Sequence, residues 1–537
     1  MSKVGTLLFG VVVCSGGAAS AGGLYLPGSG AISTSRAGAA IASTDNGEAL
    51  GINPAGLAKT TGTTITLSMA FIDYAMKFQR RGTYDDVPDV DLAYEGQPYP
   101  LVEDASGPAL GIGGFQPIPV FVVTTDLGGV VPGLRLAAGI YAPNSYPFRD
   151  LCTHQPGAGC QKYEFDRDPD ELPSPARYDV VTRDAVLFMP TLAASYRILP
   201  NLDIGGRFGW GFADASSSVH VWAAPGNVVE DVGGDGLLQV QGKDNFVPSY
   251  GFGLTYRPTP AIELAAVYNS EISIDAKGTA RTTLGPRSGS SGIEVMVVPL
   301  PDDAAQCAKG GVIGAFKACI TAELPRSATI GGRYRFFGVR DEERGDIELD
   351  VGWENWGNPA ATDYRVQIDS EIVTAMGGGL SIKKNVVRHG FQDVFNARLG
   401  GSWRFSMADN VLIARGGIGY DSAAAKPGWQ RADIDGAART TITAGAGFRT
   451  KRFQIDAGFG VVLEGSNNNP GDCNPISPLP ADLGCNRDGV QASLDDRQGP
   501  DPINPLVVPE QQLQAPVNQG VFESHYIMFM LGATTWF

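Results

Sequence analysis

The chain lacks the features of a helical membrane protein and of a nucleic-acid-binding protein. It contains no apolar run of about 18 residues or more, the length that signals a transmembrane helix. Its formal charge at pH 7 is −16, and charged residues make up only 18% of the sequence. A basic surface, which is the usual mark of a nucleic-acid partner, is therefore not expected.

Recognisable catalytic and metal-binding patterns are also missing. The chain has four histidines, and none stands in an HExxH spacing. It has no phosphate-binding loop and no dinucleotide-binding glycine motif. His220 follows the serines 216–218, but neighbours in sequence do not make the spatial Ser–His arrangement that a barrel hydrolase needs. We therefore expect no enzyme activity, no metal and no cofactor.

Residues 1–21 have the pattern of a secretory signal peptide. Lys3 supplies the positive start, residues 4–13 form a short apolar stretch, and Ala19-Ser20-Ala21 is a small-residue cleavage site. A lipoprotein signal around Cys14 is the alternative, but a valine precedes that cysteine where a small residue is expected. We predict that the mature chain begins at residue 22.

Glycine is abundant and is mixed with strand-forming residues. The chain has 71 glycines in 537 residues, well above the ~7% of an average protein. Fourteen segments have the composition and alternation of β-strands. They are residues 64–78, 119–126, 134–142, 185–197, 202–222, 250–257, 263–274, 327–337, 346–368, a segment ending at 405, 411–421, 440–449, 453–463 and 526–537.

Short and long connections alternate between these segments. The short ones are residues 199–201, 258–260, 406–410 and 450–451, and the long ones are approximately 80–114, 147–183, 223–243, 281–324, 422–438 and 465–523. Outer-membrane barrels have short periplasmic turns, long outer loops and an even number of strands. The alternation predicts an all-β fold, a 14-stranded antiparallel transmembrane β-barrel, with a soluble β-sandwich as the alternative.

The last predicted strand supports the barrel. Its alternate residues would meet lipid on one mainly apolar face, and the chain ends on an aromatic residue. These residues are Ile527, Phe529, Leu531, Ala533, Thr535 and Phe537.

Six cysteines remain once the signal peptide is removed, and they form three local pairs. An even number of cysteines in a secreted chain indicates disulfides. Pairing within each loop is favoured by proximity, while other pairings or free thiols stay open. The pairs are Cys152 with Cys160, Cys307 with Cys319, and Cys473 with Cys485, all in predicted long connections.

Residues 22–62 differ from the strands that follow. They are rich in Gly, Ala and Ser and contain Asn53, Pro54, Ala55 and Gly56. The segment is too small to build its own core, so we expect it to lie inside the barrel. The predicted organisation is a signal peptide at 1–21, a plug at 22–62 and the barrel at 63–537.

Residues 23–59 resemble the N-terminal hatch of the FadL family of outer-membrane transporters. The hallmark of that hatch is an NPA or NPAG motif just before the first strand, which Asn53, Pro54, Ala55 and Gly56 match. Further segments resemble the family in its order, namely residues 252–272, 324–336, 350–358 and 397–427. The cysteine-bearing loops and residues 465–523 depart from the family, which leaves the substrate open.

The resemblance implies a passive channel in the bacterial outer membrane, in contact with its lipid and expected to be a monomer. Hydrophobic molecules, either fatty acids or aromatic hydrocarbons, would bind among the outer loops. They would pass into a lumenal pocket and leave sideways through a gap in the wall. A general diffusion porin is an alternative, although a porin would lack a plug. A surface barrel that displays disulfide-closed loops for adhesion is another.

The resemblance also suggests site residues. The family's gap lies at a kink in the third strand, where this chain has Ala142, Pro143 and Asn144. Pro143 cannot donate a ladder hydrogen bond, although it could equally just end the strand. Arg207 and Arg365 are candidate partners for a carboxylate headgroup, and their alternative role is in the polar lining that barrels generally have.

Overall fold

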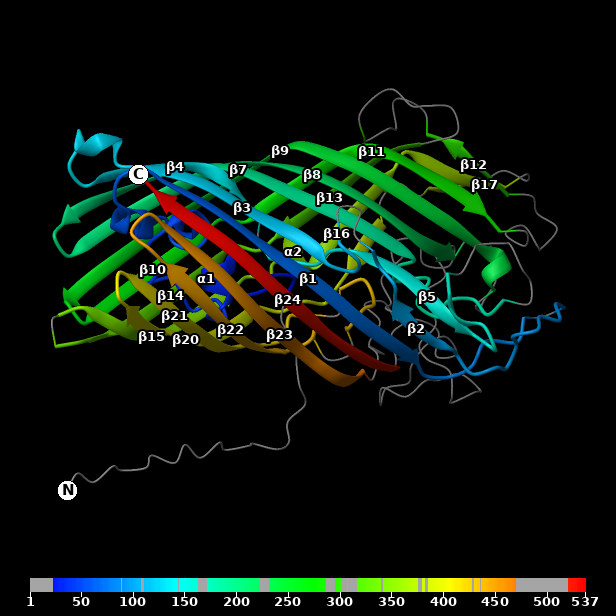
Figure 1. Ribbon diagram of the computed structural model, residues 1–537. Coiled ribbons are helices and arrows are strands. Elements are labelled where there is room, and N and C mark those ends of the chain that lie inside the picture. The colour runs from blue at the N-terminus through cyan, green and yellow to red at the C-terminus, as the bar shows by residue number, and fades with distance from the viewer. Residues whose placement is uncertain are drawn as a thin grey trace, which may run out of the picture.

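A closed antiparallel barrel dominates the structure, a computed structural model (Figure 1). It describes residues 23–469 and 520–537, except 88, 108–110, 143, 163–170, 223–230, 286–294, 301–306, 308–315, 340, 375–378, 382–384, 427–428 and 435. Fourteen strands of the described chain form the wall. The last strand, β24 (Gly520–Trp536), pairs with the first, β1 (Thr64–Arg80), along the full length of both and so closes the barrel.

Twelve further wall strands complete the barrel, two of them interrupted. They are β3 (Gln116–Thr125), β4 (Leu134–Tyr141), β7 (Thr182–Leu199), β8 (Leu202–Trp222), β9 (Asp235–Thr259), β10 (Ile262–Asn269) with β11 (Ile272–Leu284), β13 (Phe316–Leu324) with β14 (Ser327–Phe337), β15 (Glu343–Glu354), β20 (Val394–Met407), β21 (Asn410–Asp421), β22 (Arg439–Arg449) and β23 (Phe453–Asn469). β10 and β11 serve as one wall strand because both pair with β9.

The remaining elements are short. They are α1 (Ala31–Thr34), η1 (Gly47–Leu50), η2 (Pro54–Lys59), β2 (Leu101–Asp104), η3 (Leu127–Gly129), β5 (Arg149–Gln155), β6 (Gly159–Gln161), η4 (Val232–Gly234), β12 (Val295–Pro299), α2 (Pro359–Thr362), β16 (Asp363–Ile368), β17 (Ser370–Thr374), β18 (Gly379–Ser381) and β19 (Asn385–Arg388). Across the described residues, no helix is both long and apolar enough to cross a membrane.

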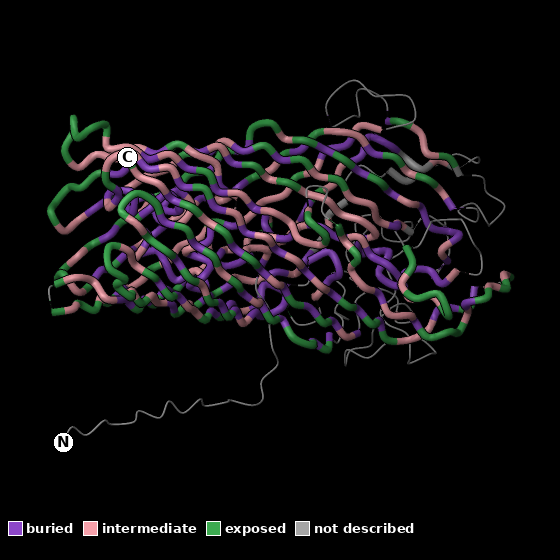
Figure 2. Tube along the Cα trace, viewed as in Figure 1, coloured by how far each residue is buried: buried purple, intermediate pink, exposed green. Residues whose placement is uncertain are grey.

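Side chains alternate between the outside and the lumen along the wall (Figure 2). On β24, Phe529 and Leu531 are 45% and 56% exposed, whereas their neighbours Met528 and Met530 are buried. Successive residues of a strand point to opposite faces of the sheet, so the large apolar side chains of β24 lie on the outer face of the barrel. The face predicted from the sequence of the last strand is confirmed.

The fourteen predicted segments correspond one to one with the wall strands, but some boundaries were wrong. β9 begins at Asp235 rather than at residue 250, because its polar outward residues, such as Lys243, obscure the strand pattern. The segment 346–368 is not one strand. β15 ends at Glu354, and β16 follows as a separate strand after α2, which begins at Pro359.

Residues 23–62, which we call the N-terminal segment, pack inside the barrel. In Figure 1 they are the dark-blue part of the chain, near the end where the C-terminus lies. α1 contacts β1, β23 and β24, while η2 contacts β4, β7, β8 and β9. The segment therefore touches opposite stretches of the wall and occupies the lumen between them.

Glycines on the inner face of the wall make room for the N-terminal segment. A Cβ at Gly205 would overlap the backbone of Pro54 and Ala55, and a Cβ at Gly253 would overlap the Asn53 side chain. The same holds at Gly417, where the backbone of Arg36 lies too close. Close approach between the wall and the N-terminal segment thus explains why these wall positions are glycine.

Two of the three predicted disulfides are present, Cys152–Cys160 and Cys307–Cys319. Cys473 and Cys485 lie outside the described residues, as does the predicted signal peptide at 1–21. Cys319 does not lie in a loop as predicted, because β13 already begins at Phe316.

The close approach at Gly205 can be tested by adding one methyl group. In Gly205→Ala the new group meets backbone atoms that cannot turn aside, so we expect the N-terminal segment to be displaced. Overpacking of this kind costs ~1–3 kcal/mol, which should raise the rate at which added protease cleaves the segment about tenfold. Gly206→Ala is the control, since its Cβ would lie 3.6 Å from the Phe252 ring. Equal cleavage rates in the two variants would contradict the packing described.

Candidate functional site

The Asn53-Pro54-Ala55-Gly56 motif ties the N-terminal segment to the wall. Asn53 caps η2, with its Oδ1 accepting the Ala55 N–H at 3.0 Å. Its Nδ2 donates to the Ile41 carbonyl at 2.7 Å and to Thr255 Oγ1 of β9 at 3.3 Å. Because Asn53 is fully buried, each of these bonds replaces water that the side chain has lost.

Three acidic side chains of β15, Asp346, Glu348 and Asp350, form what we call the acid ladder. They point into the lumen and are buried. Arg36 Nη2 lies 2.7 Å from Asp346 and 3.0 Å from Glu348. The ladder also accepts backbone N–H groups of the N-terminal segment, at 2.9 Å from Ala40 to Asp350 and 2.6 Å from Ala42 to Glu348. Removing one partner of such a buried pair leaves the other charge buried without a partner, which is strongly destabilising. The ladder therefore holds the segment in place.

Glu48 is a second buried acid, within the N-terminal segment itself. Its carboxylate accepts the N–H groups of Ile32 and Ser33, both at 2.9 Å. Burial raises the pKa of Glu48 to about 7, because desolvation of the charged form outweighs these hydrogen bonds. Its charge therefore changes near neutral pH.

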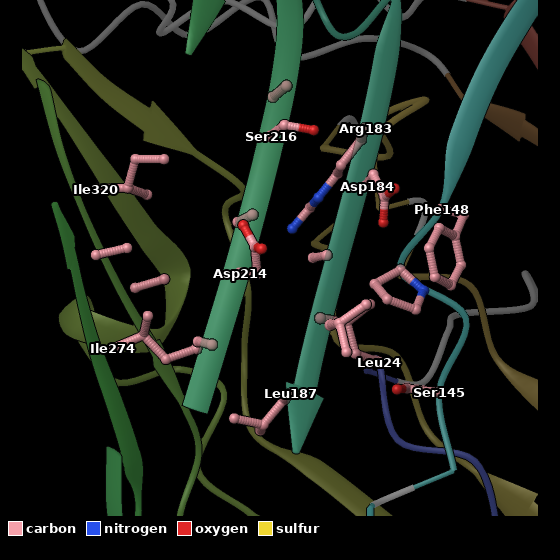
Figure 3. Close-up of a pocket in the computed structure, with 18 of the residues that line it drawn as sticks. Leu24, Ser145, Phe148, Arg183, Asp184, Leu187, Asp214, Ser216, Ile274 and Ile320 are labelled. Atoms are coloured by element: carbon pink, nitrogen blue, oxygen red, sulfur yellow. The ribbon is translucent and has the colours of Figure 1, made fainter. Parts of the chain in front are cut away.

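A largely apolar cavity of about 430 Å³ lies in the lumen. Its walls come from β7, β8, β9, β11 and β13, and from the N-terminal segment through Leu24 and Tyr25. Figure 3 shows Ile274, Ile320, Leu187, Leu24 and Phe148 around it. A pocket of this size and apolar character is typical of a site for small hydrophobic ligands.

The hydrogen-bond ladder of the barrel wall has a gap beside this cavity. β4 pairs with β7 up to Tyr141↔Met189, and the next ladder pair of β7 on that side is Arg149↔Arg183 in β5. Within the described chain, residues 184–188 of β7 thus have no ladder partner on this side. Across the gap, residues 116–120 of β3 also pair on only one side.

The cavity reaches this gap from the lumen. Its lining includes Ala185 and Leu187, together with Val186 and Phe188, which are 45% and 42% exposed on the outer face of the same strand. Ala142 lines the cavity as well, and Asn144 lies in the intervening segment. Pro143 lies outside the described residues.

A charged cluster borders the cavity where the long connections meet it. Arg183 lies 3.7 Å from Asp433, which also contacts His389 at 2.8 Å, and Arg431 lies 3.0 Å from Asp179. Burial alone would raise the pKa of Asp433, but its contacts with His389 and Arg431 hold that pKa below its usual range. In the view of Figure 3 the Arg183 guanidinium lies between β7 and β8.

The two arginines predicted as headgroup contacts occupy different places. Arg207 lines a second, more polar cavity of about 150 Å³ between the N-terminal segment and the wall. Arg365 is exposed on β16, whereas its neighbours Tyr364 and Val366 line the large cavity. The structure therefore does not bring the two together.

Sequence reasoning missed Arg183 and the acid ladder. The ladder had a visible signal, because residues 346–350 alternate acidic and apolar side chains. Arg183 fell at the end of a predicted long loop, where no alternation indicates which way a side chain points.

One group of potential metal ligands occurs in the described part of the chain, formed by Glu103, His154 and Cys160. Cys160 is bonded to Cys152, so it offers no thiolate, and a metal needs the deprotonated thiol.

Comparisons with known proteins agree with this geometry. A family model described as "Outer membrane protein transport protein (OMPP1/FadL/TodX)" matches residues 158–471, more than half of the chain. No curated protein sequence matches.

Solved structures of similar fold include a FadL homologue from Pseudomonas aeruginosa, with a TM-score of 0.63 and 13% identity over 96% of this chain and 100% of that chain. The toluene transporter TodX of Pseudomonas putida has a TM-score of 0.55 and 14% identity, over 95% of this chain and 99% of its own. The toluene transporter TbuX of Ralstonia pickettii has a TM-score of 0.55 and 13% identity over the same shares. At such identities the likeness shows the fold alone.

The raised pKa of Glu48 predicts that the docked N-terminal segment weakens as pH rises. The carboxyl has a pKa of about 7 when docked against an ordinary value of 4.5, which at ~1.4 kcal/mol per pKa unit amounts to about 3 kcal/mol. This stabilisation is complete below pH 4.5 and is lost as pH passes 7. We expect amide protons of the segment, corrected for intrinsic exchange, to lose protection between pH 5 and 8.

Two variants isolate Glu48 in that measurement. Glu48→Gln removes the titrating group and should abolish the pH slope. Glu103→Gln should retain it, because a hydrogen bond from Lys77 keeps the pKa of Glu103 below its usual range, so that group stays ionised throughout. A wild-type slope that persists in Glu48→Gln would show that another group is responsible.

Proposed function

Because the chain belongs to the OMPP1/FadL/TodX family of outer membrane transport proteins, we propose that it is a passive channel for hydrophobic compounds. The main compounds that it transports are long-chain fatty acids. It acts as a monomer in the bacterial outer membrane. The observation that carries this proposal is the apolar cavity that reaches a gap in the barrel wall. A polar solute would gain nothing from such a lining, whereas each Å² of apolar surface taken from water is worth ~25 cal/mol.

The proposed route runs from the long connections into the cavity and then sideways into lipid. Ala142, residues 144–148 and the N-terminal segment border the proposed exit. Asn144 joins them, because its Nδ2 donates to the Pro27 carbonyl at 2.9 Å and its carbonyl accepts the Leu26 N–H at 2.7 Å. A shift of the N-terminal segment, the proposed hatch at 22–62, would therefore move the rim of the gap. No energy source is needed, since the ligand moves down its own gradient.

Arginines beside the apolar space favour fatty acids over pure hydrocarbons. Arg183 borders the large cavity and Arg207 lines its neighbour, and a carboxylate gains charge-assisted hydrogen bonds from such donors. Aromatic hydrocarbons are the second candidate, because two structures of similar fold are toluene transporters.

The packed lumen opposes a general diffusion porin, whose function requires an open aqueous channel. A barrel that only displays loops would not require the cavity or the gap.

Filling the cavity should block binding and uptake of hydrophobic ligands. Ala276 is buried and lines the cavity, so the Ala276→Trp side chain would occupy the space that the ligand needs. We expect at least tenfold weaker binding of a labelled long-chain fatty acid and of toluene, and a matching loss of uptake into proteoliposomes. Lys277→Trp, at an outward-facing position 57% exposed at its side chain, is the control.

Two outcomes of this experiment would refute the proposal. One is that wild-type protein binds neither ligand while its proteoliposomes freely admit small sugars, which indicates a porin. The other is that Ala276→Trp and Lys277→Trp bind both ligands as the wild type does, which places the binding site elsewhere.

A further inference from the structure

Three short strands, β2, β5 and β6, carry four potential metal ligands on one face. Glu103 of β2 lies directly opposite Cys152 of β5. On the other side of β5, His154 lies directly opposite Cys160 of β6. Cys152 and His154 are two residues apart on one strand and therefore share a face, and directly opposite partners lie on that same face. We call these four residues the hairpin cluster.

The side chains of the hairpin cluster converge at distances that suit a metal ion. Ligand atoms of Glu103, His154 and Cys160 all lie within 4.8 Å of one another, and His154 Nε2 lies 3.3 Å from Glu103 Oε2. Two ligands of a tetrahedral zinc ion are ~3.3–3.8 Å apart, because each bonds at ~2.0–2.3 Å. The side chains of His154 and Glu103 are 39% and 28% exposed, so an ion in solution can reach them.

Lys77 of β1 holds Glu103 in a suitable orientation. Lys77 lies directly opposite Glu103, and its Nζ is 2.8 Å from Glu103 Oε1. This contact leaves Oε2, the carboxylate oxygen beside His154, for a metal. Carboxylates that bind metals are themselves held by hydrogen bonds of this kind.

The disulfide between Cys152 and Cys160 closes the hairpin cluster to a metal. A metal binds the thiolate form of cysteine, and a disulfide sulfur has no proton to lose. Two molecules of a thiol, RSH, can break the S–S bond by supplying two electrons and two protons. Cys152 and Cys160 then become thiols, and the reductant leaves as RSSR. Each thiol releases its proton when a metal binds, which completes a set of two thiolates, one imidazole and one carboxylate.

The second disulfide, Cys307–Cys319, has different neighbours. Cys319 Sγ lies 3.4 Å from the amide oxygen of Gln367, and amide oxygens suit magnesium, calcium and manganese better than zinc. A carboxylate nearby, Asp369, accepts the Cys307 N–H at 3.1 Å. Among the residues that the structure describes, three such ligands come within reach of one ion at the hairpin cluster alone.

We propose that the hairpin cluster is a redox-masked site for a divalent metal of the zinc type. The disulfide occupies the site in the oxidised chain, and a bound ion takes its place after reduction by a thiol. Two thiolates and an imidazole favour zinc over magnesium or calcium. This inference goes beyond the proposed transport of hydrophobic compounds and does not depend on it.

A metal at this site would keep β5 and β6 joined to β2 in the reduced chain. β2 and β5 lie toward the end of the barrel opposite the C-terminus (Figure 1). β5 also pairs with β7 at Arg149↔Arg183, on one border of the ladder gap. The hairpin beside the gap would thus be cross-linked in both redox states, by sulfur alone in one and by a metal in the other.

Zinc protection of individual cysteines tests the site in the full-length wild-type protein. The protein is reduced, the reductant is removed without air, and iodoacetamide modification of each cysteine is followed by peptide mass spectrometry with and without Zn²⁺. The free thiolate is the nucleophile, and ligation to zinc occupies it. We expect zinc to slow modification of Cys152 and Cys160 about tenfold or more, while Cys307 and Cys319 are unaffected and serve as internal controls.

Two variants distinguish a complete ligand set from capture by two thiols alone. His154→Gln and Glu103→Gln keep both cysteines of the hairpin cluster. Each should raise the zinc concentration needed for half-maximal protection about tenfold or more, as losses around a metal site do. His525→Gln, which removes an exposed histidine of β24 outside the cluster, is the control and should match wild type. A wild-type circular dichroism spectrum shows that each variant is folded.

Four results would refute the proposal, each for a different reason. Zinc that binds the oxidised protein as tightly as the reduced protein would show that the disulfide masks nothing. Equal protection of Cys307 and Cys319 would show that any reduced pair binds zinc. Protection that neither His154→Gln nor Glu103→Gln weakens would restrict the ligands to the two cysteines. Reduced wild-type protein in which zinc protects no cysteine would exclude the site altogether.

Discussion

Everything in this structure depends on closing a sheet whose outer face is largely apolar. A backbone N–H or C=O group has no water to bind in hydrocarbon, so each strand must pair on both sides. Pairing of β24 with β1 achieves this and places the first and last wall strands side by side. Closure also creates an interior that must be filled, and the N-terminal segment fills it because glycines such as Gly205 and Gly253 let it approach the wall.

The gap beside β7 is a departure from full pairing, and the residues around it suit an interrupted ladder. Pro117 and Pro119 of β3 have no N–H to leave unpaired. The segment after β4 bonds to the N-terminal segment through Asn144 instead of to a neighbouring strand. Ladder hydrogen bonds are thus missing beside β7, and contacts with the N-terminal segment replace part of them. The position of the N-terminal segment in the lumen is therefore linked to the structure of the wall at this gap.

Charge is distributed in the lumen according to what each region does. The acid ladder forms ion pairs with Arg36 and, at Asp346, with Arg333, and it holds the N-terminal segment. Around the large cavity, by contrast, most side chains are apolar and charged groups stand at its border. The cavity of about 150 Å³ at Arg207 falls between these two cases, since Arg207 donates to two neutral oxygens and lies over the Tyr141 ring. The lumen therefore separates a structural region of balanced charge from a region that can accept a ligand.

The sequence by itself determined the class of fold, the number of strands and the alternation of turns and loops. These follow from side-chain periodicity and turn residues, which are local properties. It also indicated that the N-terminal segment packs against the barrel, because the segment is too small to form a core alone. It indicated the local disulfides as well, of which Cys152–Cys160 and Cys307–Cys319 are present. In β9 the end of the strand carries polar outward side chains and does not show the alternation of apolar and polar residues. The strand boundary predicted there was therefore wrong.

Only the tertiary structure decided which lumen side chains meet. Arg207 and Arg365 looked alike in sequence, yet one lines a chamber and the other is exposed. Arg183 lines the apolar cavity from the start of β7, although the sequence placed it at the end of a predicted long loop. A barrel brings together residues hundreds of positions apart, as Arg36 with Asp346 shows. Such contacts depend on strand register, closure and the path of the plug, which no local pattern of residues encodes.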